Sequence, residues 1–288
     1  MKVIDIINEK TPSLSFEVFP PKTSDKFDSV QHAVRDIAKL SPSFMSVTYG
    51  AGGGTSQYTV DIASDLLSKG VTPLAHLTCI SSDKKNIKEM LTKLKDRGIE
   101  NILALRGDIL PETDTNNLSY HYASELAEEI REFGGFCIGG ACYPEGHPES
   151  ENSKSDIESL KKKIDAGCQF LTTQMFFDNN ILYNFLYRIQ RAGIFVPIVA
   201  GIMPVTNAKQ IKRICSISSN ALPQRFLRIV DRYEHNPEAM KQAGIAYATE
   251  QVVDLFANGI NAVHIYSMNN PSVAEKIKEN ISELLKSE

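Results

Sequence analysis

The sequence predicts an α/β protein that folds as a single (β/α)8 barrel, a TIM barrel with additional helices, over residues 1–288. Eight short apolar runs rich in β-branched residues alternate with amphipathic segments of helical length, and eight parallel strands close such a barrel. No Gly/Ser/Pro-rich linker divides the chain. The turn of an open dinucleotide-binding sheet is also absent, because Thr55 stands where the pattern G-x-G-x-x-G requires its last glycine.

The predicted strands follow one another along the whole chain. The first two, SLSFEVF and FMSVTY, combine aromatic with β-branched residues; TPLAHL, NILALR, FCIGGAC, FLTTQM, VPIVA and NAVHIY follow as short apolar runs. We expect the strands at residues 13–19, 44–49, 72–77, 101–106, 136–142, 170–175, 196–200 and 261–266.

Amphipathic segments between these runs predict the helices, and several of them end on a glycine, the residue that most readily caps a helix in the left-handed conformation. Gly70, Gly98, Gly167 and Gly193 are such residues. We expect helices at residues 25–40, 57–69, 83–97, 119–133, 153–167, 179–192, 206–217, 237–258 and 271–286.

Charge and composition restrict the partners and the compartment. Lys and Arg total 31 against 35 Asp and Glu, for a net charge of −4 without a basic block, so we expect neither nucleic acid nor a membrane as a partner. Asp5 and Glu9 stand where a signal peptide would be apolar, which favours the cytoplasm. The cysteines form no C-x-x-C pair, and their spacing to His76 and His147 completes no zinc set, so we expect no disulfide and no metal.

Polar residues stand at the carboxyl ends of most predicted strands, where barrel enzymes carry their active sites. Because these ends converge on one opening, the sequence predicts a catalytic site there. The residues, in chain order, are Glu17, Thr48, Tyr49, His76, Arg106, Gly107, Asp108, Tyr143, His147, Gln174 and Tyr266.

Glu17 is the candidate general acid, since partial dehydration in an apolar mouth raises the pKa of a glutamate from ~4.3 toward ~6–7. The alternative is an ion pair between Glu17 and Arg106, and Arg106 and Asp108 are equally open to a structural pairing. His76 as a core histidine and Gln174 as a hydrogen-bonding residue within the barrel are the corresponding alternatives for those two side chains.

Two further features lie near the predicted mouth. Gly139 and Gly140 within the fifth strand indicate a close approach, either of a flat ring or of neighbouring barrel side chains. The run Lys161–Lys163 either neutralises a phosphate or forms an ordinary solvated face.

Seven segments together resemble the methylenetetrahydrofolate reductase family, FAD-dependent barrel enzymes of one-carbon metabolism. They occur in the family's order and span most of the chain, which is similar to the short bacterial form without an added regulatory domain. The segments are SFEVFPPKT at 15–23, SVTYGA at 46–51, AHLTC at 75–79, LALRGD at 103–108, YPEGHPE at 143–149, TQMFFD at 173–178 and GIMPV at 201–205.

The resemblance implies a ping-pong reaction, in which a donor first reduces FAD and the flavin then passes hydride to 5,10-methylenetetrahydrofolate, giving 5-methyltetrahydrofolate. It implies that Glu17 protonates the folate to open its ring and that Asp108 stabilises the cationic iminium. The implied folate-binding residues are Glu17, Asp108, Gln174, Gln210 and Tyr266. The implied FAD-binding residues are Thr48, Tyr49, Ala51, His76, Arg106, Gly107, Asp108, Tyr122, Ala123, Tyr143, His147, Asp156, Ser159, Lys162 and Lys163.

Four residues depart from the family's pattern. Asn270 replaces an arginine that contacts folate, Ile214 replaces a phenylalanine that stacks on the ligand, Ser159 replaces an asparagine, and Lys162 replaces an arginine. We therefore expect the cofactor chemistry to be retained and donor recognition to differ, with NADH, NADPH or a protein electron carrier as the donor.

Other functions remain open at this stage. We expect a folate substrate and a homo-oligomer, with a flavin-holding subunit of a larger electron-transfer complex as one alternative. An unrelated barrel lyase is the other, and it needs a Schiff-base lysine in the mouth. None of the predicted strands four to eight ends on lysine.

Overall fold

The computed structural model describes residues 1–21, 23–49, 56–109, 117–217 and 222–286. Within these residues, eight parallel strands close into a barrel in sequence order, with β8 paired to β1. The predicted (β/α)8 fold is thereby confirmed. The strands are β1 (Ser13–Val18), β2 (Met45–Val47), β3 (Pro73–Thr78), β4 (Asn101–Leu105), β5 (Cys137–Cys142), β6 (Phe170–Thr173), β7 (Ile198–Ile202) and β8 (Ala262–Tyr266).

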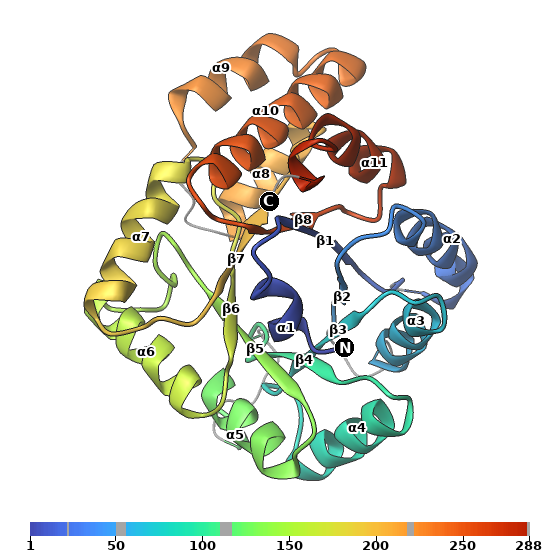
Figure 1. Cartoon of the computed structure of the whole chain (residues 1–288), viewed down its shortest axis with the longest axis vertical. Helices are drawn as coiled ribbons and strands as arrows, with labels where there is room; N and C mark the ends of the chain where they lie inside the picture. The colour runs from blue at the N-terminus through green and yellow to red at the C-terminus, as the bar shows by residue number, and fades with distance from the viewer. Residues whose placement is uncertain (22, 50–55, 110–116, 218–221, 287–288) are drawn as a thin grey trace.

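The helices form a ring around the strands (Figure 1). In the described part of the chain, none of them combines the length and apolarity needed to cross a membrane. The helices of the ring are α2 (Phe27–Ala38), α3 (Ser56–Ser68), α4 (Lys84–Asp96), α5 (Ala123–Phe133), α6 (Ser153–Asp165), α7 (Asn179–Arg191), α8 (Ala208–Ile217), α10 (Pro237–Ala257) and α11 (Pro271–Asn280).

The structure contains elements that the sequence pattern did not predict. These are α1 (Val3–Ile7) and α9 (Gln224–Tyr233), which packs on α10 at the periphery (Figure 1). The predicted helices at 25–40 and 271–286 each include a short 3-10 turn in the structure, η1 (Ser24–Lys26) and η2 (Leu284–Lys286). A five-residue helix shows no helical period, and α9 buries only Phe226 and Val230, so its apolar face is narrow.

The helix predicted from residue 119 begins at Ala123 instead. Glu125 Oε2 accepts a hydrogen bond from Tyr122 N at 3.2 Å, which satisfies a free amide at the helix start and fixes that start at this position.

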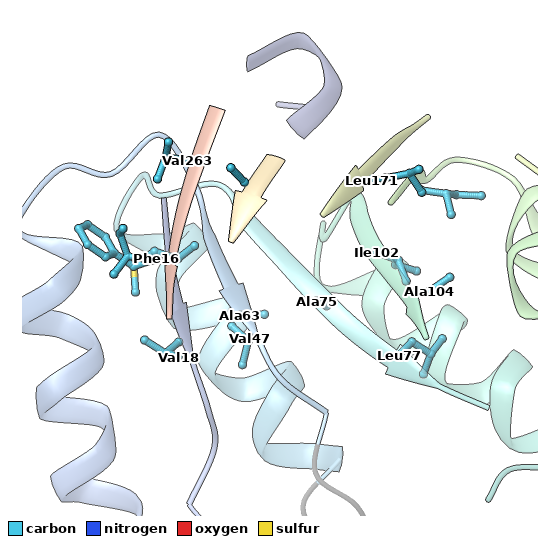
Figure 2. Packing of buried hydrophobic residues seen from close by; sticks show 14 of the residues in the cluster. Phe16, Val18, Val47, Ala63, Ala75, Leu77, Ile102, Ala104, Leu171 and Val263 are labelled. Carbon is cyan, nitrogen blue, oxygen red and sulfur yellow. The ribbon is translucent and has the colours of Figure 1, made fainter. Parts of the chain in front are cut away.

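Side chains alternate between two environments along each strand, as the pleat requires. The outward side chains pack against the helices and form the main core; Figure 2 shows Phe16 and Val18 of β1 and Val47 of β2 near Ala63 of α3. The inward side chains form an apolar layer at the amino ends of the strands, including Leu74, Leu103 and Phe170, and more polar residues toward the carboxyl ends. The barrel is therefore packed at one end and open for chemistry at the other.

Helix α1 closes the packed end. It lies over the centre of the barrel (Figure 1), and Val3, Ile6 and Ile7 pack on the apolar layer. The buried Asn101 at the start of β4 ties α1 down, because its Oδ1 accepts from Val3 N at 2.8 Å and its Nδ2 donates to the carbonyls of Met1 and Pro73.

Replacing Asn101 with alanine is expected to lower the free energy of unfolding by about 3 kcal/mol, since it removes the partner of three backbone groups, two of them in buried hydrogen bonds. Urea unfolding of the variant at neutral pH measures this loss. Because Asn101 lies at the closed end, we expect ligand binding at the mouth to be unchanged. Unaltered stability would show that α1 is held by its apolar contacts alone.

The glycine pair in β5 is explained by packing. A Cβ on Gly139 would overlap the ring of Phe170, and a Cβ on Gly140 would lie 3.1 Å from Cys168 Sγ and Leu171 Cδ2. Of the two alternatives that the sequence left open, the structure supports close packing within the barrel rather than a ring stacked on the strand.

Candidate active site

A cavity of about 420 Å³ opens at the carboxyl ends of the strands. Strands from all around the barrel contribute to it, as the convergence of polar strand ends predicted. The predicted site residues that line it are Glu17, Thr48, His76, Tyr143, Gln174, Gln210 and Tyr266.

Glu17 lies on β1 with its carboxyl group inside this cavity, and burial raises its pKa to about 8. A titratable neighbour is His76, whose Nε2 lies 3.8 Å from Glu17 Oε2. The alternative pairing of Glu17 with Arg106 is wrong, because Arg106 binds Glu149 instead. At neutral pH, Glu17 is therefore a protonated carboxyl that has a proton to donate.

Both buried histidines beside the cavity are neutral, because burial lowers the pKa of His76 and of His264 to about 3. Ser15 Oγ donates to the carbonyl of Val263, so it accepts from His264 Nδ1 at 2.7 Å. His264 Nε2 then accepts from Ser46 Oγ at 2.9 Å. This assigned tautomer uses both ring nitrogens of His264. His76 Nε2, in contrast, is buried without a hydrogen-bond partner among the described residues.

Tyr266 reaches from β8 past the neighbouring strand β7 to the end of β6. Its hydroxyl donates to the carbonyl of Thr173, and its pKa is raised by burial and by the nearby Glu17. A Cβ on Gly201 would overlap this hydroxyl and lie 2.5 Å from the Thr173 carbonyl oxygen. Gly201 is therefore the residue that lets the tyrosine ring pass close to β7.

Arg106 forms a two-pronged ion pair with Glu149 at the rim of the mouth, with Nη1–Oε2 and Nη2–Oε1 distances of 2.6 and 2.7 Å. The pairing of Arg106 with Asp108 that the sequence left open is thus not the one formed. Asp108 is exposed at the rim, and its charge adds to burial in raising the pKa of Tyr143.

The loop after β5 is held by Asp156, whose Oδ1 accepts from His147 N at 3.3 Å and from Ser150 Oγ at 3.1 Å. His147 also meets the ring of Tyr143 edge-on at 4.6 Å between centroids. Asp156 therefore acts in the structure by ordering this loop.

The lysine run on α6 divides between two environments. Lys163 donates to the carbonyl of Ala141 at 2.7 Å, and burial lowers its pKa, whereas Lys161 and Lys162 are exposed. Only the two exposed lysines match the solvated alternative for this run. The other predicted residues outside the cavity lining are Tyr49, Gly107, Tyr122, Ala123 and Ser159, and Ala51 lies outside the described residues.

Two polar residues of the cavity are also held by backbone contacts. Gln174 Oε1 accepts from Met175 N at 2.9 Å, and Gln210 Oε1 accepts from Thr206 N and Asn207 N at the start of α8. Asn270 caps α11 by accepting from Val273 N at 3.3 Å, so the residue that replaces the family's arginine has a structural role here.

Sequence reasoning missed Ser46, His264 and Met268, all of which line the cavity. The signal for the first two was available. Residues two apart on a strand face the same side, so Ser46 and His264 share the inward face with Thr48 and Tyr266. Met268 lies in a loop after β8, where the two-residue alternation of a strand does not apply.

The burial of these groups makes stability depend on pH. Folding raises the pKa of Glu17 from 4.5 to about 8, so between these values the folded state holds more protons and is destabilised as pH rises. Folding lowers the pKa of His76 and His264 from 6.5 to about 3, so below pH 6.5 the unfolded state holds more protons and stability falls as pH falls.

We therefore expect these three groups to give maximal stability near pH 6.5, and Glu17 to contribute a decline of about 1 kcal/mol per pH unit from there to pH 8, partly offset near pH 6.5 by the two histidines. The Glu17→Gln variant should lack this decline. Urea unfolding of both proteins at half-unit intervals from pH 6.5 to 8 measures the difference. Parallel declines in the two proteins would show that Glu17 is not held protonated by burial.

The strands form a closed barrel, and the mouth at their carboxyl ends holds a protonated carboxyl beside neutral histidines. This arrangement defines a barrel enzyme that is equipped to donate a proton to a bound substrate.

Comparison with known proteins identifies the family. The family profile described as methylenetetrahydrofolate reductase matches residues 2–282. A 5,10-methylenetetrahydrofolate reductase of Pectobacterium carotovorum subsp. carotovorum is 35% identical over 266 residues, covering 92% of this chain and 88% of the relative. The chain therefore belongs to the methylenetetrahydrofolate reductase family, and it is an oxidoreductase.

Two more distant likenesses extend the comparison. The Arabidopsis thaliana protein named methylenetetrahydrofolate reductase (NADH) 1 is 35% identical over 290 residues, which cover 93% of this chain and 49% of that longer protein. A Clostridium thermocellum structure, described as binding two copies of 5-methyl-5,6,7,8-tetrahydrofolic acid, superposes with a TM-score of 0.69 over 98% of this chain and 99% of that chain. At 12% identity, this second likeness concerns the fold alone.

Proposed function

We propose that the chain reduces 5,10-methylenetetrahydrofolate to 5-methyltetrahydrofolate in a ping-pong reaction with FAD as cofactor. The observation that carries the proposal is Glu17, a carboxyl that burial keeps protonated to about pH 8 inside the cavity at the barrel mouth. A family member needs such an acid, because the five-membered ring of the folate opens only when its leaving nitrogen gains a proton.

Glu17 performs this step as a general acid. Its carboxyl proton passes to N10 of the folate as the bond between N10 and the methylene carbon breaks, which leaves a cationic iminium at N5. The resulting Glu17 carboxylate and the rim carboxylate of Asp108 then favour the cation electrostatically. Neutral His76 and His264 add no competing positive charge beneath the site.

The mouth fits a flavin in two respects. His76 Nε2 is buried at the cavity without a partner among the described residues, as expected of a group that binds a ligand. Tyr122, at the start of α5, leaves 64% of its surface exposed. When bound, FAD supplies hydride transfer between the donor and the folate. We propose that it is held by the residues named for it above, with Thr48, His76 and Tyr143 on the cavity side and Arg106, His147 and Lys162 farther out.

Folate binding is assigned to Gln174, Gln210 and Tyr266 together with Glu17 and Asp108. An uncharged donor and acceptor such as Gln174 suits the edge of a heterocycle, and it directly follows β6 and lines the same cavity as Glu17. No lysine or arginine is among the described residues that line the cavity. Recognition within the cavity therefore rests on neutral hydrogen-bonding groups.

The electron donor is proposed to be NADH or NADPH, and the Arabidopsis relative's name, which specifies NADH, favours the former. We propose that the single barrel over residues 1–288 is the catalytic domain of a cytoplasmic homo-oligomer. A Schiff-base lyase is disfavoured, because the cavity lining includes no described lysine.

Anaerobic half-reactions test the proposal. The protein is reconstituted with FAD, reduced in parallel with NADH, NADPH and reduced ferredoxin, freed of donor, and mixed with methylenetetrahydrofolate. We expect the flavin to be reoxidised within one turnover, with one equivalent of 5-methyltetrahydrofolate formed. A correctly folded protein that binds no FAD, or a reduced flavin that the folate leaves reduced, overturns the proposal.

A further inference from the structure

The loop after β8 has an unusual backbone at the edge of the cavity. Met268 and Asn269 both have a φ of 53°, in the left-handed region that residues other than glycine seldom adopt. Among the described residues, Ser41, with a φ of 49°, is the one other non-glycine residue with positive φ. Such conformations persist where surrounding contacts hold them, and they cluster at functional sites.

The side-chain hydrogen bonds of Ser267 and Asn269 in this loop reach the end of β1 and the residue after it. Asn269 Nδ2 donates to the carbonyl of Phe19 at 2.8 Å, and Phe19 N donates back to Asn269 Oδ1 at 3.0 Å. Ser267 Oγ, on a residue that is 2% exposed, donates to the carbonyl of Glu17 at 2.6 Å. Two side chains thereby continue the pairing between β1 and β8 beyond its last register pair, Glu17 with Tyr266. We call this pair of residues, Ser267 and Asn269, the clamp.

Glu17 depends on its backbone for its position. In the described structure its carboxyl group makes no hydrogen bond, and His76 Nε2 lies 3.8 Å from it. Its main chain pairs with Ser46 of β2 on one side and Tyr266 of β8 on the other, one residue before β1 ends. Strand ends fray unless further contacts hold them. Here the clamp supplies the hydrogen bonds that hold β1 at and just beyond its end.

We propose that Ser267 and Asn269 are positioning residues, which hold the end of β1 so that the Glu17 carboxyl faces the substrate from a dry position. This inference rests on the proposed function. The titratable groups that line the cavity with Glu17 are His76 from β3, Tyr143 after β5, and His264 and Tyr266 from β8, whereas the clamp side chains hydrogen-bond to backbone groups of Glu17 and Phe19. Loss of the clamp therefore acts on Glu17 by movement and hydration rather than by a change of charge.

Asn269→Gly is the principal test, because glycine keeps the left-handed backbone without strain and removes only the amide. In the FAD-free protein, ¹³C NMR titration of the Glu17 carboxyl, assigned by its absence in Glu17→Gln, should show the pKa lowered by about one unit or more as water enters. In the FAD-loaded protein, reoxidation by methylenetetrahydrofolate should slow about tenfold or more. Reduction by the donor should stay within about twofold, because it needs no proton from Glu17.

Ser267 supplies a second, independent variant. Ser267→Ala should reproduce both effects, and Ser267→Thr, which keeps the hydroxyl, should restore them toward the parent values. Asn101→Ala removes a buried amide with similar contacts at the closed end of the barrel, and Ser41→Gly removes the other left-handed side chain. Both controls should leave the Glu17 titration and both half-reactions unchanged.

The outcomes separate the two proposals. If the parent protein is not reoxidised by the folate, the proposed function fails, while the NMR titration still compares the clamp variants with the parent. If Asn269→Gly and Ser267→Ala both keep the parent's Glu17 pKa, or change it no more than Asn101→Ala does, the positioning role is overturned. A loss of folate turnover matched by an equal loss of donor reduction also overturns it, since a general loss of structure then explains both.

Discussion

Replacement of Glu17 with glutamine is expected to slow reoxidation of the reduced flavin by methylenetetrahydrofolate by roughly 10²- to 10⁴-fold, the usual contribution of a general acid. The amide has nearly the same shape but no proton to donate to N10. In the described structure no residue of the cavity hydrogen-bonds to the Glu17 carboxyl, so the substitution deprives no neighbouring group of a partner. Stopped-flow absorbance of the flavin under anaerobic conditions measures the rate.

The pH dependence of the same rate gives a second signature. In the parent protein, reoxidation should decline as pH rises through about 8, where Glu17 loses its proton. In Glu17→Gln this decline should be absent. The control is Glu89→Gln on α4, an exposed carboxyl remote from the mouth. Folate-dependent reoxidation that stays within about threefold of the parent rate in Glu17→Gln would remove Glu17 as the acid.

Replacement of Gly244 with alanine is expected to have the largest effect on stability, a loss of about 3 kcal/mol from overpacking and backbone displacement. Gly244 is buried on α10, and a Cβ there would overlap the backbone carbonyl of Val205. A backbone group cannot turn away as a side chain can, so α10 or the segment after β7 must shift.

The displaced segment leads into α8, which brings Gln210 and Ile214 to the cavity. We therefore expect Gly244→Ala to raise the KM for the folate as well as to lower the urea midpoint, although residue 244 does not line the cavity. Ala246→Ser adds one heavy atom to the exposed side of the same helix and should change neither quantity by much. Equal stability of the two variants would mean that the contact with Val205 relaxes freely.

Much of the barrel was predictable because its signal is local. Each strand buries its outward side chains and carries small or polar inward side chains toward the mouth. This alternation is visible in the sequence, so Glu17, His76 and Tyr266 could be assigned to one opening. Helices with broad apolar faces, such as α4 and α7, were equally readable. Helix α9 was not, because two buried residues do not make a distinctive period.

The partners of the charged groups were not predictable in the same way. The sequence offered Glu17 and Asp108 as partners for Arg106, but the path of the loop after β5 brings Glu149 to it instead. Lys163 turned inward to the carbonyl of Ala141 while its neighbours stayed in solvent. Long flexible side chains choose among partners by small differences in distance and burial.

The sequence alone determined the order of strands and helices, the family, and the set of residues at the barrel mouth, because pleat alternation and helical period are written into neighbouring positions. The tertiary structure alone decided which of those residues are in contact. His264 hydrogen-bonds to two serines, the Tyr266 ring lies beside Gly201, and Ser267 hydrogen-bonds to the carbonyl of Glu17. These contacts join residues that are far apart in the sequence and that barrel closure brings together, and no local preference of either partner encodes them.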